Sequence, residues 1–295
     1  MIYYFQKVTL LKGSREVSAM YDIIRVCDNV YDGFYNEKCI IDFTIPKTNH
    51  AVPVLIWFHG GDLESGSRHE GFIGRLAAEY GVAVASADYR TYPDAAYPDF
   101  FNDAARACEF VWNYGQSTGL FNRYFIGGAE AGAHIAMMLY FNPVYMREFV
   151  MSPDLFHGYI FDGGHPTSHP AVLKERCIDG RAVRIDKSAP IYYIDTPPSA
   201  ESDRPPVLIT SAEHEIEGIG ARNDMLRCAM LDFGYSPEKV ERTVMRGFAH
   251  GEYRKKPDGN GSYPINRVFG EFITKHANKI VNNNDKTGTE DDFVL

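Results

Sequence analysis

An acidic residue stands where the sequence predicts a sharp strand-to-helix corner. In "FIGGAEAGAHIAMML", residues 125–139, Glu130 separates an apolar run from a small-residue run. The first run is typical of a buried strand and the second of a helix. Gly128 and Gly132 flank the corner, because a side chain at either place would collide with the tight turn. We expect residue 130 to be strained and exposed at the carboxyl end of a central strand, where serine would act as a nucleophile.

Two glycines upstream could bind developing negative charge. "WFHGGDLESGSR" ends an apolar run with Gly60 and Gly61. Backbone N–H groups that follow a strand can point into a shared cavity and form an oxyanion hole. We assign this role to Gly60 and Gly61, together with the N–H of Ala131 at the start of the predicted helix. The alternative is that the glycines serve only a turn.

An acid and a histidine follow the corner in chain order. "PPVLITSAEHEIEG" carries Glu213 and Glu215 after an apolar strand, and "VMRGFAHGEY" carries His250 after another strand. Nucleophile, acid and histidine in this order form a hydrolase triad. Glu215 is the preferred acid because it lies further into the loop, and Glu213 is its rival.

Other candidate side chains are assigned structural roles. "GQSTG" matches G-x-S-x-G, but a helical pattern precedes Ser117, so we interpret it as the end of a helix and not as a nucleophile. His134 lies one helical turn beyond Glu130 and is expected to pack in the helix. His59 is expected to form structural hydrogen bonds. His165 and His169 could line a pocket or lie at the surface.

These residues require a sheet that brings distant loops together. The continuous apolar runs at 52–61 and 82–90 enclose a helical pattern, which indicates a parallel sheet covered on both faces. The alternation continues to a closing helix at 265–280, after three β-rich segments that form an antiparallel lead-in. We predict a doubly wound, mostly parallel α/β sheet in one domain, residues 1–281, with a cap-like insertion at 163–205 and a polar tail at 282–295. The remaining predicted strands and helices are the strands at 2–11, 21–26, 39–45, 123–127, 158–164, 205–212 and 240–247, and the helices at 71–81, 99–114, 130–140 and 221–233.

Charge and composition exclude several classes of partner. Thirty basic residues against 39 acidic residues give a net charge of -9, which argues against binding to nucleic acid. The N-terminal "MIYYFQKVTL" does not have the pattern of a signal peptide, and no apolar stretch has the length of a membrane span. The odd number of scattered cysteines is typical of reduced thiols in a cytoplasmic protein without a cysteine metal site; they are Cys27, Cys39, Cys108, Cys177 and Cys228.

Over residues 50–280 the chain resembles a known superfamily. "WFHGG", "DYRTYPDAAYPDFFNDAARACEFV", "FIGGAEAGAHIAMML", "PPVLITSAEHE" and "GFAHGEY" are similar to the motifs of α/β-hydrolases, in the esterase and lipase group with His-Gly-Gly loops. This group includes carbohydrate acetyl and feruloyl esterase-like members. The resemblance implies that His250 is the triad histidine and Glu215 its acid. It also implies no cofactor, a small-molecule ester or carbohydrate-derived ligand, and a possible oligomer.

The glutamate changes the expected mechanism. A carboxylate has no proton for a histidine to remove and attacks esters poorly, so the acyl-enzyme route is closed. The favoured hypothesis is an esterase scaffold that is inactive or very weak, in which Glu130 and Glu215 hold His250 as an imidazolium. In that hypothesis Glu130 could also accept hydrogen bonds from the oxyanion N–H groups. One alternative is a carboxylate nucleophile, as in haloalkane dehalogenases and epoxide hydrolases, and another is a binding protein without catalysis.

Overall fold

A computed structural model describes residues 20–195 and 204–278 of the chain. The predicted strand at 2–11, the predicted tail at 282–295 and part of the cap-like segment lie outside these ranges. Within them, no helix combines the length and apolar character that crossing a membrane requires.

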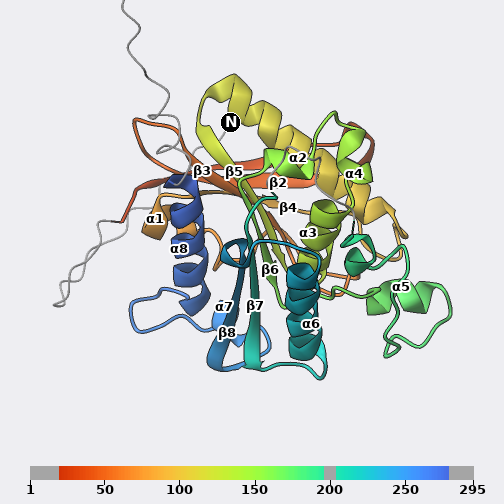
Figure 1. Ribbon diagram of the computed structural model, residues 1–295. Coiled ribbons are helices and arrows are strands. Elements are labelled where there is room, and N and C mark those ends of the chain that lie inside the picture. The colour runs from red at the N-terminus through yellow and green to blue at the C-terminus, as the bar shows by residue number, and fades with distance from the viewer. Residues whose placement is uncertain (1–19, 196–203, 279–295) are drawn as a thin grey trace, which may run out of the picture.

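Eight strands form one sheet in the order β1-β2-β4-β3-β5-β6-β7-β8 (Figure 1). The first two strands pair antiparallel, β2 also pairs antiparallel with β4, and every later pair is parallel. The predicted mostly parallel α/β sheet with an antiparallel lead-in is therefore confirmed. The strands are β1 Ile23–Val30, β2 Ile40–Pro46, β3 Val52–Phe58, β4 Ala83–Ala87, β5 Phe121–Ala129, β6 Gly158–Asp162, β7 Val207–His214 and β8 Val240–Ala249.

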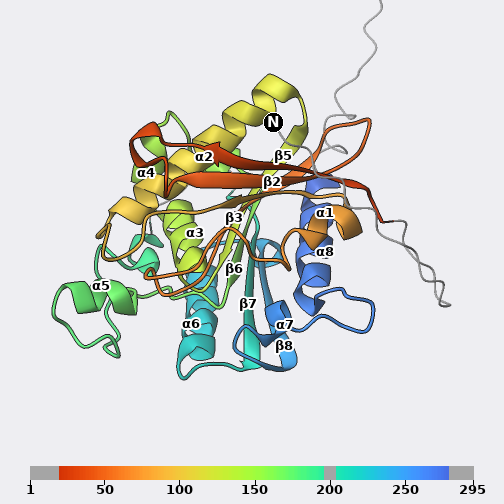
Figure 2. The ribbon, with the colours of Figure 1, turned by 180° about the vertical axis from the view of Figure 1, so that it is seen from behind.

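Helices cover both faces of the sheet (Figures 1 and 2). Ile56 and Phe58 of β3 pack into a core with α2 and α3, whereas the alternate residues Leu55 and Trp57 pack into a second core with α1 and α8. This alternation explains why the β3 sequence is apolar throughout, since each face meets a helix layer. The α-helices are α1 Arg75–Tyr80, α2 Asp99–Thr118, α3 Ala131–Phe141, α4 Val144–Arg147, α5 Pro170–Glu175, α6 Ile219–Asp232, α7 Glu252–Lys255 and α8 Pro264–Asn278, and the 3-10 helices are η1 Gly33–Tyr35, η2 Pro153–Leu155, η3 Pro190–Tyr193 and η4 Pro237–Lys239.

The carboxyl ends of the central strands meet at one edge of the sheet. Ala129 at the end of β5 pairs with Asp162 at the end of β6, and His214 at the end of β7 pairs with Ala249 at the end of β8. Because these strands are parallel, the loops that follow them are neighbours, although they are far apart in sequence. The predicted acid and histidine loops both leave from this edge.

The described part of the cap-like segment contains α5 and η3 and no strand of the sheet. It packs beside the start of α2, where the Tyr97 hydroxyl donates to the Lys187 carbonyl at 3.0 Å. Its buried serine pair, Ser168 and Ser188, shares the Asp186 carboxylate. The serine pair thus joins two parts of the segment, and the Tyr97 hydrogen bond joins the segment to the start of α2.

Candidate active site

Glu130 occupies the corner between β5 and α3 with a strained backbone. Its φ of 54° and ψ of -112° lie outside the regions that non-glycine residues normally adopt. The two flanking glycines are required by contact: a Cβ on Gly128 would lie 2.3 Å from the Gly132 carbonyl carbon, and a Cβ on Gly132 would lie 2.0 Å from the Phe58 carbonyl oxygen. Only hydrogen fits in either place, so α3 can pack closely against β3 and hold Glu130 at the apex.

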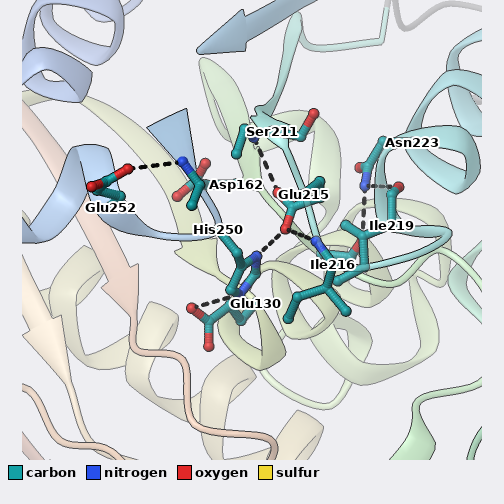
Figure 3. A network of polar contacts seen from close by, with 12 residues as sticks. Glu130, Asp162, Ser211, Glu215, Ile216, Ile219, Asn223, His250 and Glu252 are labelled. Carbon is teal, nitrogen blue, oxygen red and sulfur yellow. Dashed lines mark hydrogen bonds and ion pairs between the residues drawn. The ribbon is translucent and has the colours of Figure 1, made fainter. Parts of the chain in front are cut away.

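His250 lies between two carboxylates (Figure 3). Its Nε2 atom is 3.2 Å from Glu130 Oε1, and its Nδ1 atom is hydrogen-bonded to Glu215 Oε1. Glu215 is fixed in turn by the N–H groups of Ala212, at 3.0 Å, and Ile216, at 2.9 Å. The structure therefore brings together Glu130, Glu215 and His250, which come from the ends of β5, β7 and β8.

The rival acid lies elsewhere. Glu213 is exposed on β7, and its Oε2 accepts the N–H of Gly247 at 2.8 Å. Its carboxylate thus holds the end of β8 and does not reach the His250 ring. The preference for Glu215 over Glu213 agrees with this geometry.

Arg254 is a site residue that sequence patterns did not predict. This residue is buried in α7, and its Nη2 atom is 2.5 Å from Glu130 Oε1 while its Nε atom is 3.0 Å from Asp162 Oδ2. Asp162 is fully buried at the end of β6 and accepts hydrogen bonds from Thr210, at 2.6 Å, and Tyr253, at 2.7 Å. In "GEYRKK" the arginine resembles an exposed basic residue, and no local pattern marks it as buried.

The network has a consistent charge pattern. Burial alone would raise the pKa of Glu130, but hydrogen bonds from His250 and the Arg254 charge outweigh burial and lower this pKa far below the ordinary value. Burial alone would lower the pKa of His250, but Glu130 and Glu215 outweigh it and raise this pKa to about 9. At neutral pH the site therefore contains an imidazolium between two ionised carboxylates. An imidazolium cannot act as a general base.

The predicted oxyanion groups surround the corner, but they do not bind the Glu130 carboxylate. A Cβ on Gly60 would lie 2.8 Å from Glu130 Oε2, so the carboxylate packs directly against Gly60. Gly61 has a φ of 107° and turns tightly against Ser65, and Ala131 begins α3. Within the described residues, the charged partners of the carboxylate are His250 and Arg254. The hydrogen bonds that we expected from backbone N–H groups are replaced by these two cations.

The other histidines have structural contacts. His59 stacks on Tyr89 with ring centroids 4.4 Å apart, and the Tyr89 hydroxyl donates to the His59 carbonyl. His134 is fully buried and its Nδ1 bonds the His165 carbonyl at 2.6 Å. His169 caps α5 by accepting the Ala171 N–H at 3.2 Å, so it is not a surface residue. Of His59, His134, His165 and His169, His165 is the one that is partly exposed.

The literal G-x-S-x-G match is remote from this chemistry. Ser117 lies in the last turn of α2, and its hydroxyl donates to the Tyr114 carbonyl at 2.9 Å. Across the described residues, no group of three or more His, Cys, Asp or Glu side chains is placed to hold a metal ion. The charged side chains that meet at the corner are those of Glu130, Glu215, His250 and Arg254.

Comparison with known proteins supports the architecture. A family model described as alpha/beta hydrolase fold matches residues 55–146, which include the second half of β3, α2, β5 and the corner. Among solved structures, a carbohydrate esterase from gut microbiota has a TM-score of 0.67 at 16% identity over 88% of this chain and 98% of that one. Thermogutta terrifontis esterase 2 has a TM-score of 0.65 at 20% identity over 86% of this chain and 94% of that one.

Curated relatives match over shorter stretches. A probable isoprenylcysteine alpha-carbonyl methylesterase of Arabidopsis thaliana is 34% identical over 110 residues, which are 36% of this chain and 26% of the relative. A 2-hydroxyisoflavanone dehydratase of Glycyrrhiza echinata is 30% identical over 112 residues, 31% of this chain and 34% of the relative. A gibberellin receptor of Arabidopsis thaliana is 36% identical over 104 residues, 32% of this chain and 29% of the relative. The matched stretches thus span between a quarter and about a third of these relatives.

Proposed function

We propose that this chain, which has the α/β-hydrolase fold, is an esterase-type scaffold whose hydrolytic site is locked by Glu130. In this proposal it hydrolyses esters very weakly or not at all, and it binds a small ester or carbohydrate-derived molecule. The observation that carries the proposal is the position of His250, which meets Glu130 at Nε2 and Glu215 at Nδ1. The Nε2 atom is where a nucleophile would have to deliver its proton.

Two physical effects close the esterase route. Position 130 carries no hydroxyl for His250 to deprotonate, and the two carboxylates keep His250 protonated, since its pKa is raised to about 9. Arg254 adds a third constraint, because it neutralises Glu130 and holds it in place at 2.5 Å. A carboxylate held by two cations is a weak nucleophile, which also disfavours the dehalogenase-like alternative.

The names of the relatives are compatible with either catalysis or binding. The matched proteins are named as a methylesterase, a dehydratase and a receptor. The stretch they share with this chain therefore occurs in proteins with different activities. The side chains at the site, more than the fold, must decide the function of this chain.

The test is ester hydrolysis before and after restoration of the hydroxyl. The unaltered chain is expected to hydrolyse p-nitrophenyl acetate no faster than the buffer reaction does. Glu130→Ser should raise the rate by at least 100-fold over the unaltered chain, because it supplies a nucleophile and removes one of the two carboxylates that protonate His250.

Glu213→Ser is the matched control. It makes the same change at a glutamate that binds Gly247 and not His250, and it should leave the rate at the level of the unaltered chain. Rapid turnover by the unaltered chain that Glu130→Gln does not slow would overturn the proposal.

A further inference from the structure

Arg222 is a partly buried cation without a carboxylate partner. It lies in the first turn of α6, and its Nε atom is buried without a hydrogen-bond partner. Across residues 20–195 and 204–278, no Asp or Glu forms an ion pair with it, and burial lowers the pKa of its guanidinium. Arginines that lose water are ordinarily paired with an acid, because desolvation of an unpaired charge is costly.

Arg222 lies near the loop that follows β6, because its charge acts on His165 in that loop, as the charge of His250 does. The adjacent residue Asn223 donates to the carbonyls of Gly164, at 3.0 Å, and Ile219, at 2.9 Å, and so ties the start of α6 to the loop after β6. In that loop, a Cβ on Gly163 would lie 3.6 Å from His250 Cε1. Figure 3 shows Asn223 and Ile219 beside Glu215, on the side of the network away from Glu252.

His165 is close enough to Arg222 and to His250 for their charges to affect its pKa. Burial, together with the charges of His134, Arg222 and His250, lowers its pKa to about 3. His165 is therefore neutral at physiological pH. It does not act as a second cation that would bind an anion in place of Arg222. Arg222 at the start of α6 and His165 in the loop before α5 are thus close enough to interact electrostatically.

Apolar side chains accompany the cation. Ile216, which follows Glu215, is 55% exposed, and Met225, three residues after Arg222 on α6, is 37% exposed. Residues three apart are neighbours on a helix surface, so Met225 lies beside Arg222. A ligand that placed an anionic group on Arg222 could cover these apolar side chains with the rest of its body.

We propose that Arg222 binds the carboxylate of a small amphipathic ligand whose apolar body covers Ile216 and Met225. A guanidinium pairs with a carboxylate through two parallel charge-assisted hydrogen bonds, and the pairing is stronger where the guanidinium has already lost water. The inference rests on the proposed ligand-binding function and narrows its ligand to molecules that carry a carboxylate. His250 is already paired with Glu130 and Glu215, and Arg254 with Glu130 and Asp162, so of these three cations Arg222 is the one that has no acidic partner among the described residues.

The probes are 2-naphthylacetate and its uncharged analogue 2-naphthylacetamide, measured by isothermal titration calorimetry on the full chain at pH 7.5. The acid should bind at least tenfold more tightly than the amide. Arg222→Gln should abolish this preference, whereas Arg227→Gln, a change five residues further along α6 and on another face, should keep it.

The melting temperatures of the variants without ligand show whether Arg222 binds the ligand or only stabilises the fold. If Arg222 had only a structural role, the Arg222→Gln variant would unfold at a lower temperature than the unaltered chain. Arg222→Gln should leave the melting temperature unchanged or raise it, because it removes an unpaired charge. If the acid and the amide bind with equal affinity, the proposed role of Arg222 is wrong, but the proposal that the chain binds a small ligand still stands. If neither probe binds at millimolar concentration, the inference is wrong. The p-nitrophenyl acetate assay tests the locked hydrolytic site independently of this result.

Discussion

The Nε2 atom of His250 lies 3.2 Å from Glu130 Oε1, on the edge of the ring opposite to its bond with Glu215. In a working triad this edge of the imidazole receives a proton from the nucleophile. Here it faces an ionised acid, so the interaction that would start catalysis becomes an ion pair. In the proposed function this geometry blocks catalysis, and the same charge pairs stabilise the folded chain.

His250 should remain protonated at neutral pH. Its pKa is raised to about 9, and Glu130→Gln should lower it, because that variant removes one of the two carboxylates that stabilise the imidazolium. Titration of the ring nitrogens by 15N NMR measures the pKa in both proteins. A pKa near 6.5 in the unaltered chain would contradict the proposed charge state.

The stability of the fold should depend on pH over a defined window. The raised pKa of His250 provides stabilisation that is complete below its ordinary value of 6.5 and is lost as the pH rises through about 9. This stabilisation corresponds to ~3 kcal/mol. The lowered pKa of Glu130 provides stabilisation that is present above its ordinary value of 4.5 and is lost as the pH falls. Urea unfolding should show a loss between pH 7 and pH 10 that His250→Asn largely removes.

Arg254 should be a principal stabilising charge of the site. Arg254→Met leaves Asp162 and Glu130 without their shared cation, so we expect a loss of about 3 kcal/mol in unfolding free energy. Arg267→Met is the matched control at an exposed arginine of α8 and should cost less than about 0.5 kcal/mol. If Arg254→Met and Arg267→Met unfold at the same urea concentration, the network is not stabilising.

The corner should not tolerate a methyl group. In Gly132→Ala the new carbon would meet the Phe58 carbonyl oxygen at 2.0 Å, so β3 and α3 must separate, at a cost of about 3 kcal/mol or more. Gly220→Ala makes the same change in a helix where a Cβ has no atom within 4 Å, and it should be neutral or slightly stabilising. Thermal unfolding of the two variants distinguishes the positions directly.

Glu130 should not form an alkyl-enzyme ester. Both of its cationic partners reduce the reactivity of Oε1, and the carboxylate packs against Gly60. Incubation with 1-bromohexane or styrene oxide, followed by peptide mass mapping, should leave residue 130 unmodified. Modification of the exposed carboxylate of Glu213 serves as the reference for background alkylation. An adduct confined to Glu130 would instead support the carboxylate-nucleophile hypothesis.

Local sequence determined the frame of this site. Gly128 is required by a contact within the strand-turn-helix unit, with Gly132, whereas Gly132 is required by the Phe58 carbonyl of the neighbouring strand β3. The glycine spacing in residues 125–139 nevertheless predicted the corner that β5 and α3 form. Apolar runs without alternation predicted strands buried on both faces, and the order of the acid and the histidine along the chain predicted which loops meet. Each of these features depends on neighbours in sequence or on the general behaviour of parallel sheets.

Tertiary structure decided which side chains meet Glu130. Glu213 and Glu215 are two residues apart in the same segment, and a shift in register between β7 and β8 directs one to Gly247 and the other to His250. Arg254 is 124 residues from Glu130 in sequence, and its burial depends on Asp162 at the end of another strand. An ion pair between segments so far apart leaves no periodic or local signal, because it depends on packing and not on spacing along the chain.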